Sequence, residues 1–351
     1  MAKDINPRFF HFIPVSMLRP PVTISIAFVK GMVSGVQARA NGCDALLAEA
    51  GIPPALLEEP GARVTADQYV ALFELLIERF DDECLGFLSR PVKRGSLALM
   101  TRCAIDAPTL EAATRRVANV FRLLQDDVLL ELVREDALAG VALRLVDPSQ
   151  ARPAFLHELL VRIVWRLLAW LAGGQLPAVR FDFAFASPAY ASNYGKVFPA
   201  PMRFGCAQSA FWFDAAQLRK PVRRDEAAMR AFLADAQTQV IVPRRGDDLC
   251  SARVRSHLQH TQPAWPDLAA TAEALHMSTS TLQRHLANEG SSFQSLKDEL
   301  RRDTAIVRLI SSPVPLATLA FELGFADSAT FQRAFKVWTG SAPGAYRRGG
   351  L

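Results

Sequence analysis

The run Leu-Gln-Arg-His-Leu at residues 282–286 returns as Phe-Gln-Arg-Ala-Phe at residues 331–335, which sets the two arginines 49 positions apart (Arg333 minus Arg284). An apolar segment with the spacing Leu-Ala-x-x-Ala-x-x-Leu precedes each copy, at 268–275 and at 316–323. A short stretch suited to a tight turn separates each segment from its copy. The C-terminal part of the chain therefore contains an internal repeat of helix, turn and helix.

The residue types in the repeat match the needs of that unit. Ala272 and Ala320 are small enough to let the first helix of each unit lie close to the second. Gly324 tolerates the positive φ that such a turn requires. His276 takes the equivalent place in the first unit, a costlier choice that is still permitted. Ser278 is expected to cap the second helix of that unit.

Apolar residues four positions apart predict the buried face of each second helix, through Leu282 and Leu286 in the first unit and Phe331 and Phe335 in the second. The open face of the first is left with Thr279, Ser280, Gln283, Arg284 and Ala287. In a helix-turn-helix, this open face enters the major groove of DNA.

Residues 264–348 resemble the DNA-binding domain of the AraC/XylS transcription regulators, an all-α domain with two helix-turn-helix units joined by a long helix. The joining helix fits 293–310, and the runs at 320–325, 331–336 and 340–347 are similar to the family signature. The resemblance implies that the start of each second helix faces the bases. The candidate DNA-binding residues are Thr279, Ser280, Gln283, Arg284, Ser328, Ala329, Gln332, Arg333 and Lys336.

Arg284 is the sharpest of these candidates. A guanidinium can bond to O6 and N7 of guanine or hold a phosphate, and the alternative is a solvated surface charge. Arg333 is expected to contact phosphate, because Ser328 and Ala329 give the second helix little with which to distinguish bases. The second unit would then serve chiefly as an anchor.

A chain of 351 residues predicts two domains. The net charge of +5 is compatible with a nucleic-acid partner without requiring one. Residues 251–351 carry 11 Lys and Arg against 8 Asp and Glu, a balance of only +3. The five cysteines are widely spread and lack metal-type spacing, and residues 1–22 lack a signal peptide. We expect free thiols and a cytoplasmic protein.

The N-terminal part predicts an α+β domain. Helices are expected at 26–40, 44–50 and 110–124, with a further helix opened by the capping-box pair Thr65 and Gln68. Strands are expected at 128–133, 139–146, 179–185 and 210–213, the first two forming a hairpin. The apolar run 155–172 contains Arg162 and Arg166, which indicates a core helix with one wet edge and not a membrane span.

Residues 29–233 resemble the arabinose-binding-type N-terminal domain of one branch of these regulators. The resemblance depends on 155–159, 180–183, 194–198 and 201–205. It implies an effector-binding or dimerisation domain and leaves the effector open. The expected divisions are an arm at 1–22, this domain at 23–236, a linker at 237–248 and the DNA-binding domain at 249–351.

Other candidate sites have simpler interpretations. His157 and Glu158 form half of a zinc-protease motif whose second histidine is missing, which favours a buried histidine over a metal ligand. Arg180 and Asp182 would bind a polar effector or form a solvated pair. The aromatic residues Phe204, Phe211, Trp212 and Phe213 would pack in the core or line a pocket. No nucleophile, phosphate-loop or dinucleotide motif is present, so we expect no enzyme, no metal and no cofactor.

The sequence thus predicts a transcription regulator that binds double-stranded DNA and responds to a small-molecule effector. Activation is the more common role in the family, and we expect an activator. RNA polymerase and a second copy of the chain are further candidate partners, and no membrane contact is expected. Two alternatives are open for the N-terminal domain, which would serve only in dimerisation or would be an enzyme-like domain fused to a DNA reader.

Overall fold

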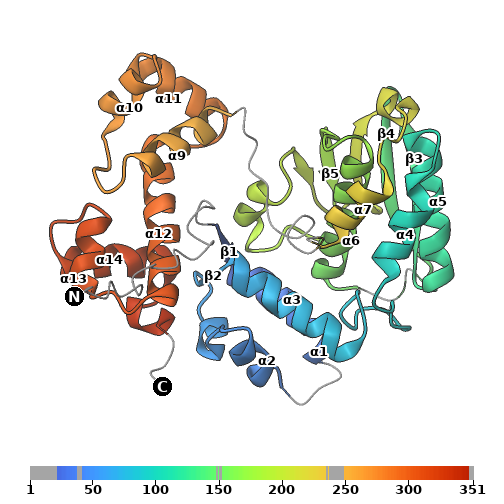
Figure 1. The fold of residues 1–351 in the computed structure, drawn as a ribbon, viewed down its shortest axis with the longest axis horizontal. Helices are drawn as coiled ribbons and strands as arrows, with labels where there is room; N and C mark the ends of the chain where they lie inside the picture. Colours follow the sequence, from blue (N-terminus) through green and yellow to red (C-terminus); the bar gives the residue numbers. More distant parts are fainter. Residues whose placement is uncertain are drawn as a thin grey trace, which may run out of the picture. The chain divides into compact units, whose positions relative to one another are not determined.

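A computed structural model describes residues 22–37, 42–147, 149, 152–234, 236 and 249–347. These residues form two compact units (Figure 1). The smaller unit holds 22–23 and 249–332, and the larger unit holds 24–236 and 333–347. The expected arm and linker lie almost wholly outside the described residues.

A five-stranded sheet with the order β3-β4-β7-β5-β6 forms the centre of the larger unit. β5 and β6 are parallel, and the other neighbours are antiparallel. The strands are β3 (Val128–Glu135), β4 (Leu138–Leu145), β5 (Arg180–Asp182), β6 (Met202–Arg203) and β7 (Ser209–Asp214). A second, two-stranded sheet joins β1 (Thr23–Ser25) to β2 (Arg63–Thr65).

The predicted hairpin is present as β3 and β4, which pair from Val128 opposite Leu145 to Glu135 opposite Leu138. The turn is tighter than expected, because only Asp136 and Ala137 lie outside the strands. Asp136 has a φ of 51°, a left-handed conformation that Asp tolerates better than most residues.

The helices of the larger unit include all five that the sequence predicts, with bounds that differ by a few residues at most. Their bounds are α1 (Ile26–Gln37), α2 (Asp44–Glu49), α3 (Ala66–Phe80), α4 (Ser96–Ile105), α5 (Leu110–Leu124), α6 (Ala154–Leu171) and α7 (Glu226–Ala234), with the 3₁₀ turns η2 (Pro54–Glu58), η3 (Ala191–Lys196), η4 (Ala215–Arg219) and η5 (Pro343–Tyr346). Thr65 and Gln68 close the predicted capping box on α3. α4 and α7 were not predicted.

α6 is the central helix of the larger unit. It contacts β4 and β7 on the sheet and α1, α4 and α5 among the helices. At Gly31 of α1, an added Cβ would come within 2.7 Å of the Phe155 ring, so the absence of a side chain permits this contact. The predicted wet edge is correct for Arg166, which is half-buried, and wrong for Arg162, which is buried. His157 is buried as expected, with its Nδ1 2.9 Å from the hydroxyl of Ser209, and Glu158 is buried beside it.

The strand expected at 179–185 is also shorter than predicted, and its polar face is not solvated. Asp182 is buried and accepts a hydrogen bond from Nε1 of Trp212 at 2.6 Å. Arg180 pairs with Asp182 at 3.1 Å and with Glu135, and its guanidinium lies 4.4 Å from the centre of the Trp212 ring. Both polar side chains are thus paired inside the protein and not solvated, and Oδ1 of Asp182 has no hydrogen-bond partner among the described residues.

The aromatic residues near β7 pack in the core, which is the first of the two roles that the sequence left open. Phe211, Trp212 and Phe213 are buried, and the half-buried Phe204 stacks on Phe183 with ring centres 5.6 Å apart. All five cysteines are free thiols. Among the described residues, no helix is both long and apolar enough to cross a membrane.

The smaller unit is helical. It contains α9 (Cys250–His260), α10 (Leu268–Ala274), α11 (Thr279–Asn288), α12 (Phe293–Ser311) and α13 (Leu316–Glu322). α14 (Ser328–Thr339) begins in this unit and passes into the larger one at Arg333. The predicted α+β domain followed by an all-α region with a long joining helix is confirmed (Figure 1).

Candidate nucleic-acid interface

α10 and α11 form the first helix-turn-helix. α10 ends in a left-handed residue, His276, with a φ of 57°. The amide of Met277 donates to the carbonyl of Ala272 at 2.9 Å, as in a Schellman motif. Ser278 then caps α11, because its hydroxyl accepts a hydrogen bond from the amide of Thr281 at 3.2 Å. The predicted roles of His276 and Ser278 are confirmed.

α13 and α14 form the second helix-turn-helix with the same bonding pattern. Gly324 has a φ of 73°, and the amide of Phe325 donates to the carbonyl of Ala320 at 2.9 Å. The carboxylate of Asp327 accepts from the amide of Thr330 at 2.7 Å. The segment between the helices is one residue longer here, 323–327 against 275–278 in the first unit.

The predicted buried positions are confirmed in both units. Ala272 and Ala320 are each 1% exposed, which fits their role at the close approach of two helices. Completely buried positions on the second helices are Leu282, Leu286, Phe331 and Phe335. Their burial fixes which face of α11 and α14 is left open.

The candidate DNA-binding residues lie on these open faces. Exposed side chains on α11 are Thr279, Ser280, Gln283 and Arg284, and on α14 they are Ala329, Gln332, Arg333 and Lys336, while Ser328 is half-buried. In the described part of the chain, no group accepts a hydrogen bond from the Arg284 guanidinium. Arg284 is therefore available for an external acceptor.

Arg301, Trp265 and Phe325 form a stack that fixes the turn of the second helix-turn-helix to α12. The guanidinium of Arg301 on α12 lies 5.1 Å from the centre of the Trp265 ring and 5.0 Å from that of Phe325. Nε1 of Trp265 donates to the carbonyl of Glu322 at 2.8 Å. Burial lowers the pKa of Arg301, and two aromatic faces compensate for part of its lost hydration.

Lys297, one turn earlier on α12, holds the loop that carries Trp265. Its ammonium donates to the carbonyls of Trp265 and Pro266 at 2.8 and 2.9 Å. This loop leads directly into α10 of the first unit. A single helix therefore contacts both the entry to the first helix-turn-helix and the turn of the second.

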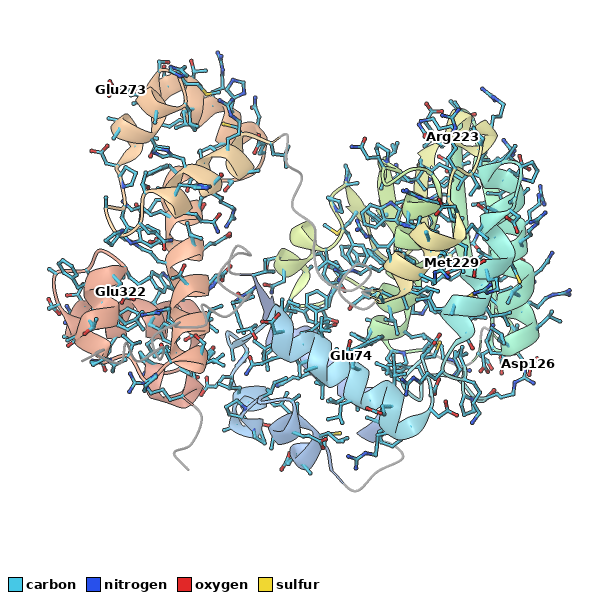
Figure 2. The ribbon with its side chains drawn as sticks, viewed as in Figure 1. Glu74, Asp126, Arg223, Met229, Glu273 and Glu322 are labelled. Atoms are coloured by element: carbon cyan, nitrogen blue, oxygen red, sulfur yellow. The ribbon has the colours of Figure 1, made fainter. Side chains whose placement is uncertain are left out.

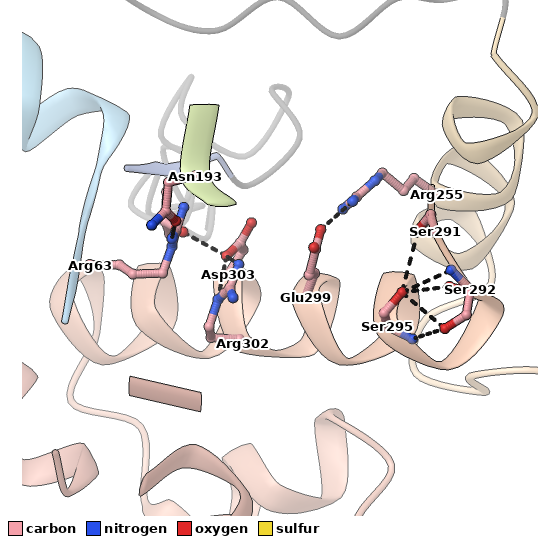
Figure 3. A network of polar contacts seen from close by, with 10 residues as sticks. Arg63, Asn193, Arg255, Ser291, Ser292, Ser295, Glu299, Arg302 and Asp303 are labelled. Atoms are coloured by element: carbon pink, nitrogen blue, oxygen red, sulfur yellow. Dashed lines mark hydrogen bonds and ion pairs between the residues drawn. The ribbon is translucent and has the colours of Figure 1, made fainter. Parts of the chain in front are cut away.

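Polar contacts also hold α9 and α13 to their neighbours. Arg255 on α9 pairs with Glu299 on α12 (Figure 3). Arg308 on α12 pairs with Glu322 on α13 at 3.0 Å (Figure 2). Glu289 accepts hydrogen bonds from two amides at the start of α9, those of Cys250 and Ser251, at 2.8 and 2.9 Å.

α12 begins at a capping box in which Ser292 and Ser295 exchange hydrogen bonds with each other's backbone (Figure 3). The helix has 19 residues and thus a length of about 28 Å. That length approaches the rise of one turn of B-DNA, about 34 Å. A helix of this length suits two reading units that lie one DNA turn apart.

The sequence predicted the open faces of the two helix-turn-helix units but not the side-chain contacts that connect these units to α12. Trp265, Lys297 and Arg301 carry no motif of their own, and their contacts join residues up to 57 positions apart. Asp327 carried a usable signal, because Asp immediately before a helix is a common N-cap. In the described part of the chain, no group of three or more His, Cys, Asp or Glu side chains is placed to hold a metal ion.

Two helix-turn-helix units with exposed polar second helices define a DNA-binding protein. Comparison with known families agrees. The arabinose-binding N-terminal domain of AraC transcription regulators matches residues 42–222, and a helix-turn-helix domain matches residues 271–349. The chain belongs to the AraC family of transcription regulators.

Two relatives that align over most of the chain support this assignment, and one solved structure is also reported for comparison. The ornithine utilization regulator of Pseudomonas aeruginosa is 28% identical over 92% of this chain and 96% of its own length. The regulator VirS of Mycobacterium tuberculosis is 24% identical over 84% of this chain and 88% of its own length. The solved structure of the P. aeruginosa regulator CdpR covers 93% of this chain and 99% of its own at 21% identity, with a TM-score of 0.32. The family places the chain among regulators and not among enzymes.

Proposed function

We propose that this protein activates transcription by binding duplex DNA through two successive major grooves, under the control of a small-molecule effector. One observation carries the proposal. Two helices with buried apolar faces, α11 and α14, present polar side chains outward, and the stack on Arg301 together with α12 ties their supporting elements to each other.

The two units have different roles in this proposal. α11 offers Ser280, Gln283 and Arg284 as groups that can bond to base edges. α14 begins with Ser328 and Ala329, which have little capacity to distinguish bases, while Arg333 and Lys336 bring positive charge suited to phosphate. The first unit then supplies most of the sequence specificity, and the second chiefly positions the protein.

The effector part of the proposal is supported by the family and by the name of one relative. The domain family that matches the N-terminal part is named for arabinose binding. A relative that aligns over most of its length is named for ornithine utilization. An effector acts only by binding one state of the protein more tightly than another. A coupling of about 1–3 kcal/mol would change DNA affinity by about fivefold to a hundredfold. We propose RNA polymerase and a second copy of the chain as further partners.

Selection of duplexes from a random library by the full-length protein, at near-physiological salt, tests this function. We expect an enriched site with two boxes about 10 base pairs apart, the first more sharply defined than the second. A reporter with this site upstream of a promoter then tests activation, and higher transcription is expected. Enrichment of no sequence under any effector condition would contradict the proposal.

A further inference from the structure

Two oppositely charged side chains on α6 line one small recess in the larger unit. Glu158 and Arg162 stand one helical turn apart and are 3% and 9% exposed. The walls opposite them include Phe28 from α1, Tyr69 from α3 and Phe198, which follows η3. Charged side chains are seldom buried this deeply unless something pairs with them.

Neither charge is fully satisfied inside the protein. One carboxylate oxygen of Glu158, Oε1, accepts hydrogen bonds from Tyr190 at 3.0 Å and from Tyr194. Among the described residues, the other oxygen, Oε2, has no hydrogen-bond partner, and neither has Nε of Arg162. Both residues line the same recess, and each has one buried polar atom with unused bonding capacity.

Burial makes the charged form of both groups less stable, which shifts the two pKa values in opposite directions. Loss of hydration raises the pKa of Glu158 to about 6, although Tyr194, Tyr190 and Arg162 oppose the shift. Loss of hydration also lowers the pKa of Arg162 to about 10. At neutral pH both groups carry their charge, and a ligand that supplies the opposite charges would restore what burial removes.

A second cavity of the larger unit has an almost entirely apolar lining. Its one carboxylate, Glu83, already accepts hydrogen bonds from the amides of Gly95 and Leu97 at 2.7 and 2.8 Å, at the start of α4. These bonds give Glu83 a structural role, so the recess on α6 is the better ligand site.

We infer that the recess binds an α-amino acid, with its carboxylate on Arg162 and its ammonium group on Glu158. The planar fork of a guanidinium matches a carboxylate, and Oε2 of Glu158 accepts from an ammonium. The aromatic walls at Phe28, Tyr69 and Phe198 suit an aliphatic side chain. This inference rests on the proposed effector response and names the chemical class of the effector.

The size of the recess sets a condition on binding. Its empty volume is about 310 Å³ with open solvent included, but only about 20 Å³ admits the centres of water molecules. That space holds about one water, so the head group enters by displacing water and shifting side chains.

Titration calorimetry of the full-length protein with single α-amino acids tests the inference. The panel holds amino acids with acidic, basic, polar and apolar side chains, with propionate and propylamine as probes that carry one charged group each. We expect one or more amino acids to bind, and each single-charge probe to bind at least about tenfold more weakly. Binding of none of the amino acids, or equal binding of propionate, would overturn the inference.

Three variants locate the site. Arg162→Met and Glu158→Gln each remove one charge while keeping a similar side-chain volume, and each should weaken amino-acid binding at least about tenfold. Arg166→Met removes a positive charge one turn further along α6, outside the recess lining, and should bind as the wild type does. Circular dichroism confirms that each variant is folded. Unchanged binding by folded Arg162→Met would contradict the assignment.

DNA affinity measured with and without the amino acid separates this inference from the proposed function. If the amino acid binds through Arg162 but leaves DNA affinity unchanged, the site stands and the effector response fails. If DNA affinity responds to a different molecule, and Arg162→Met does not alter that response, the effector response stands and the site is wrong.

Discussion

The guanidinium of Arg301 lies over the indole ring of Trp265, with its carbon 5.1 Å from the ring centre. Trp265 comes from the loop before α10, and Arg301 comes from the middle of α12. The same guanidinium lies against Phe325 in the turn of the second helix-turn-helix. Arg301 therefore connects the entry to the first helix-turn-helix with the turn of the second. The position of one helix-turn-helix relative to the other depends on this side chain.

Replacement of Arg301 by alanine should lower the stability of the smaller unit. Each cation–π contact contributes about 0.5–1 kcal/mol, so the two together predict a loss of about 1–2 kcal/mol. Differential scanning calorimetry of the full-length protein measures the shift in melting temperature. Gln294→Ala, an exposed change on the same helix, is the matched control and should shift it by much less. Equal shifts in both variants would contradict the role of the stack.

Replacement of Arg284 by alanine should weaken binding to the selected DNA site. Loss of a bidentate contact to guanine costs about 1–3 kcal/mol and relaxes the preference at that position. Fluorescence anisotropy with the selected duplex and with single-base variants measures both effects. Arg253→Ala removes the same charge from an exposed position on α9, and this variant should retain the preference for particular bases. If Arg284→Ala weakens all duplexes equally, the residue contacts phosphate.

The left-handed residues of the two turns should respond in opposite directions to substitution. His276→Gly relieves a φ of 57° and should stabilise the first unit by up to about 1 kcal/mol. Gly324→Ala imposes strain at a φ of 73° and sets a Cβ 3.0 Å from Trp265 and Arg301, which predicts a loss of about 2–4 kcal/mol. Thermal unfolding of each full-length variant measures the change. A stabilising Gly324→Ala would show that the turn adopts another conformation.

The buried pair His157 and Glu158 should give the larger unit a pH dependence with two opposing parts. Burial lowers the pKa of His157 from 6.5 to about 4, so the unfolded chain binds its proton more readily. Stability contributed by neutral His157 is complete above pH 6.5 and declines by about 3 kcal/mol as pH falls toward 4. Glu158 has a raised pKa of about 6, so its burial penalty falls by about 2 kcal/mol as pH drops from 6 to 4.5.

Single variants separate these two parts. Urea denaturation between pH 7 and pH 4.5 should show a smaller loss of stability on acidification for His157→Gln than for the wild type. Glu158→Gln, which removes the compensating part, should show a larger loss. Identical pH profiles for all three proteins would mean that neither group titrates in this range when the chain is folded.

Local patterns in the sequence predicted the helix-turn-helix units well, because each depends on residues within a few positions of one another. The positive φ of His276 and the cap at Ser278 follow from the spacing of apolar residues around one turn. The capping box at Thr65 is local in the same way. In such places sequence periodicity and turn chemistry determine the structure with little help from distant contacts.

Contacts between distant residues account for what the sequence did not predict. Nothing in the sequence indicated that Glu158 is buried, because its partner Tyr194 lies 36 positions away. Trp265 and Arg301 meet only because α9, α10 and α12 pack together. An apolar helix with a few charges has the same appearance in sequence whether those charges meet water or other side chains.

The extra residue between α13 and α14 makes the two halves of the reader inequivalent. Ser278 caps α11 after a four-residue connection, whereas Asp327 precedes α14 after a five-residue one, and the side chains offered by the two helices differ as well. In the proposed mode of binding, these unlike halves allow the protein only one orientation on its site. The bound protein would then mark one direction along the DNA.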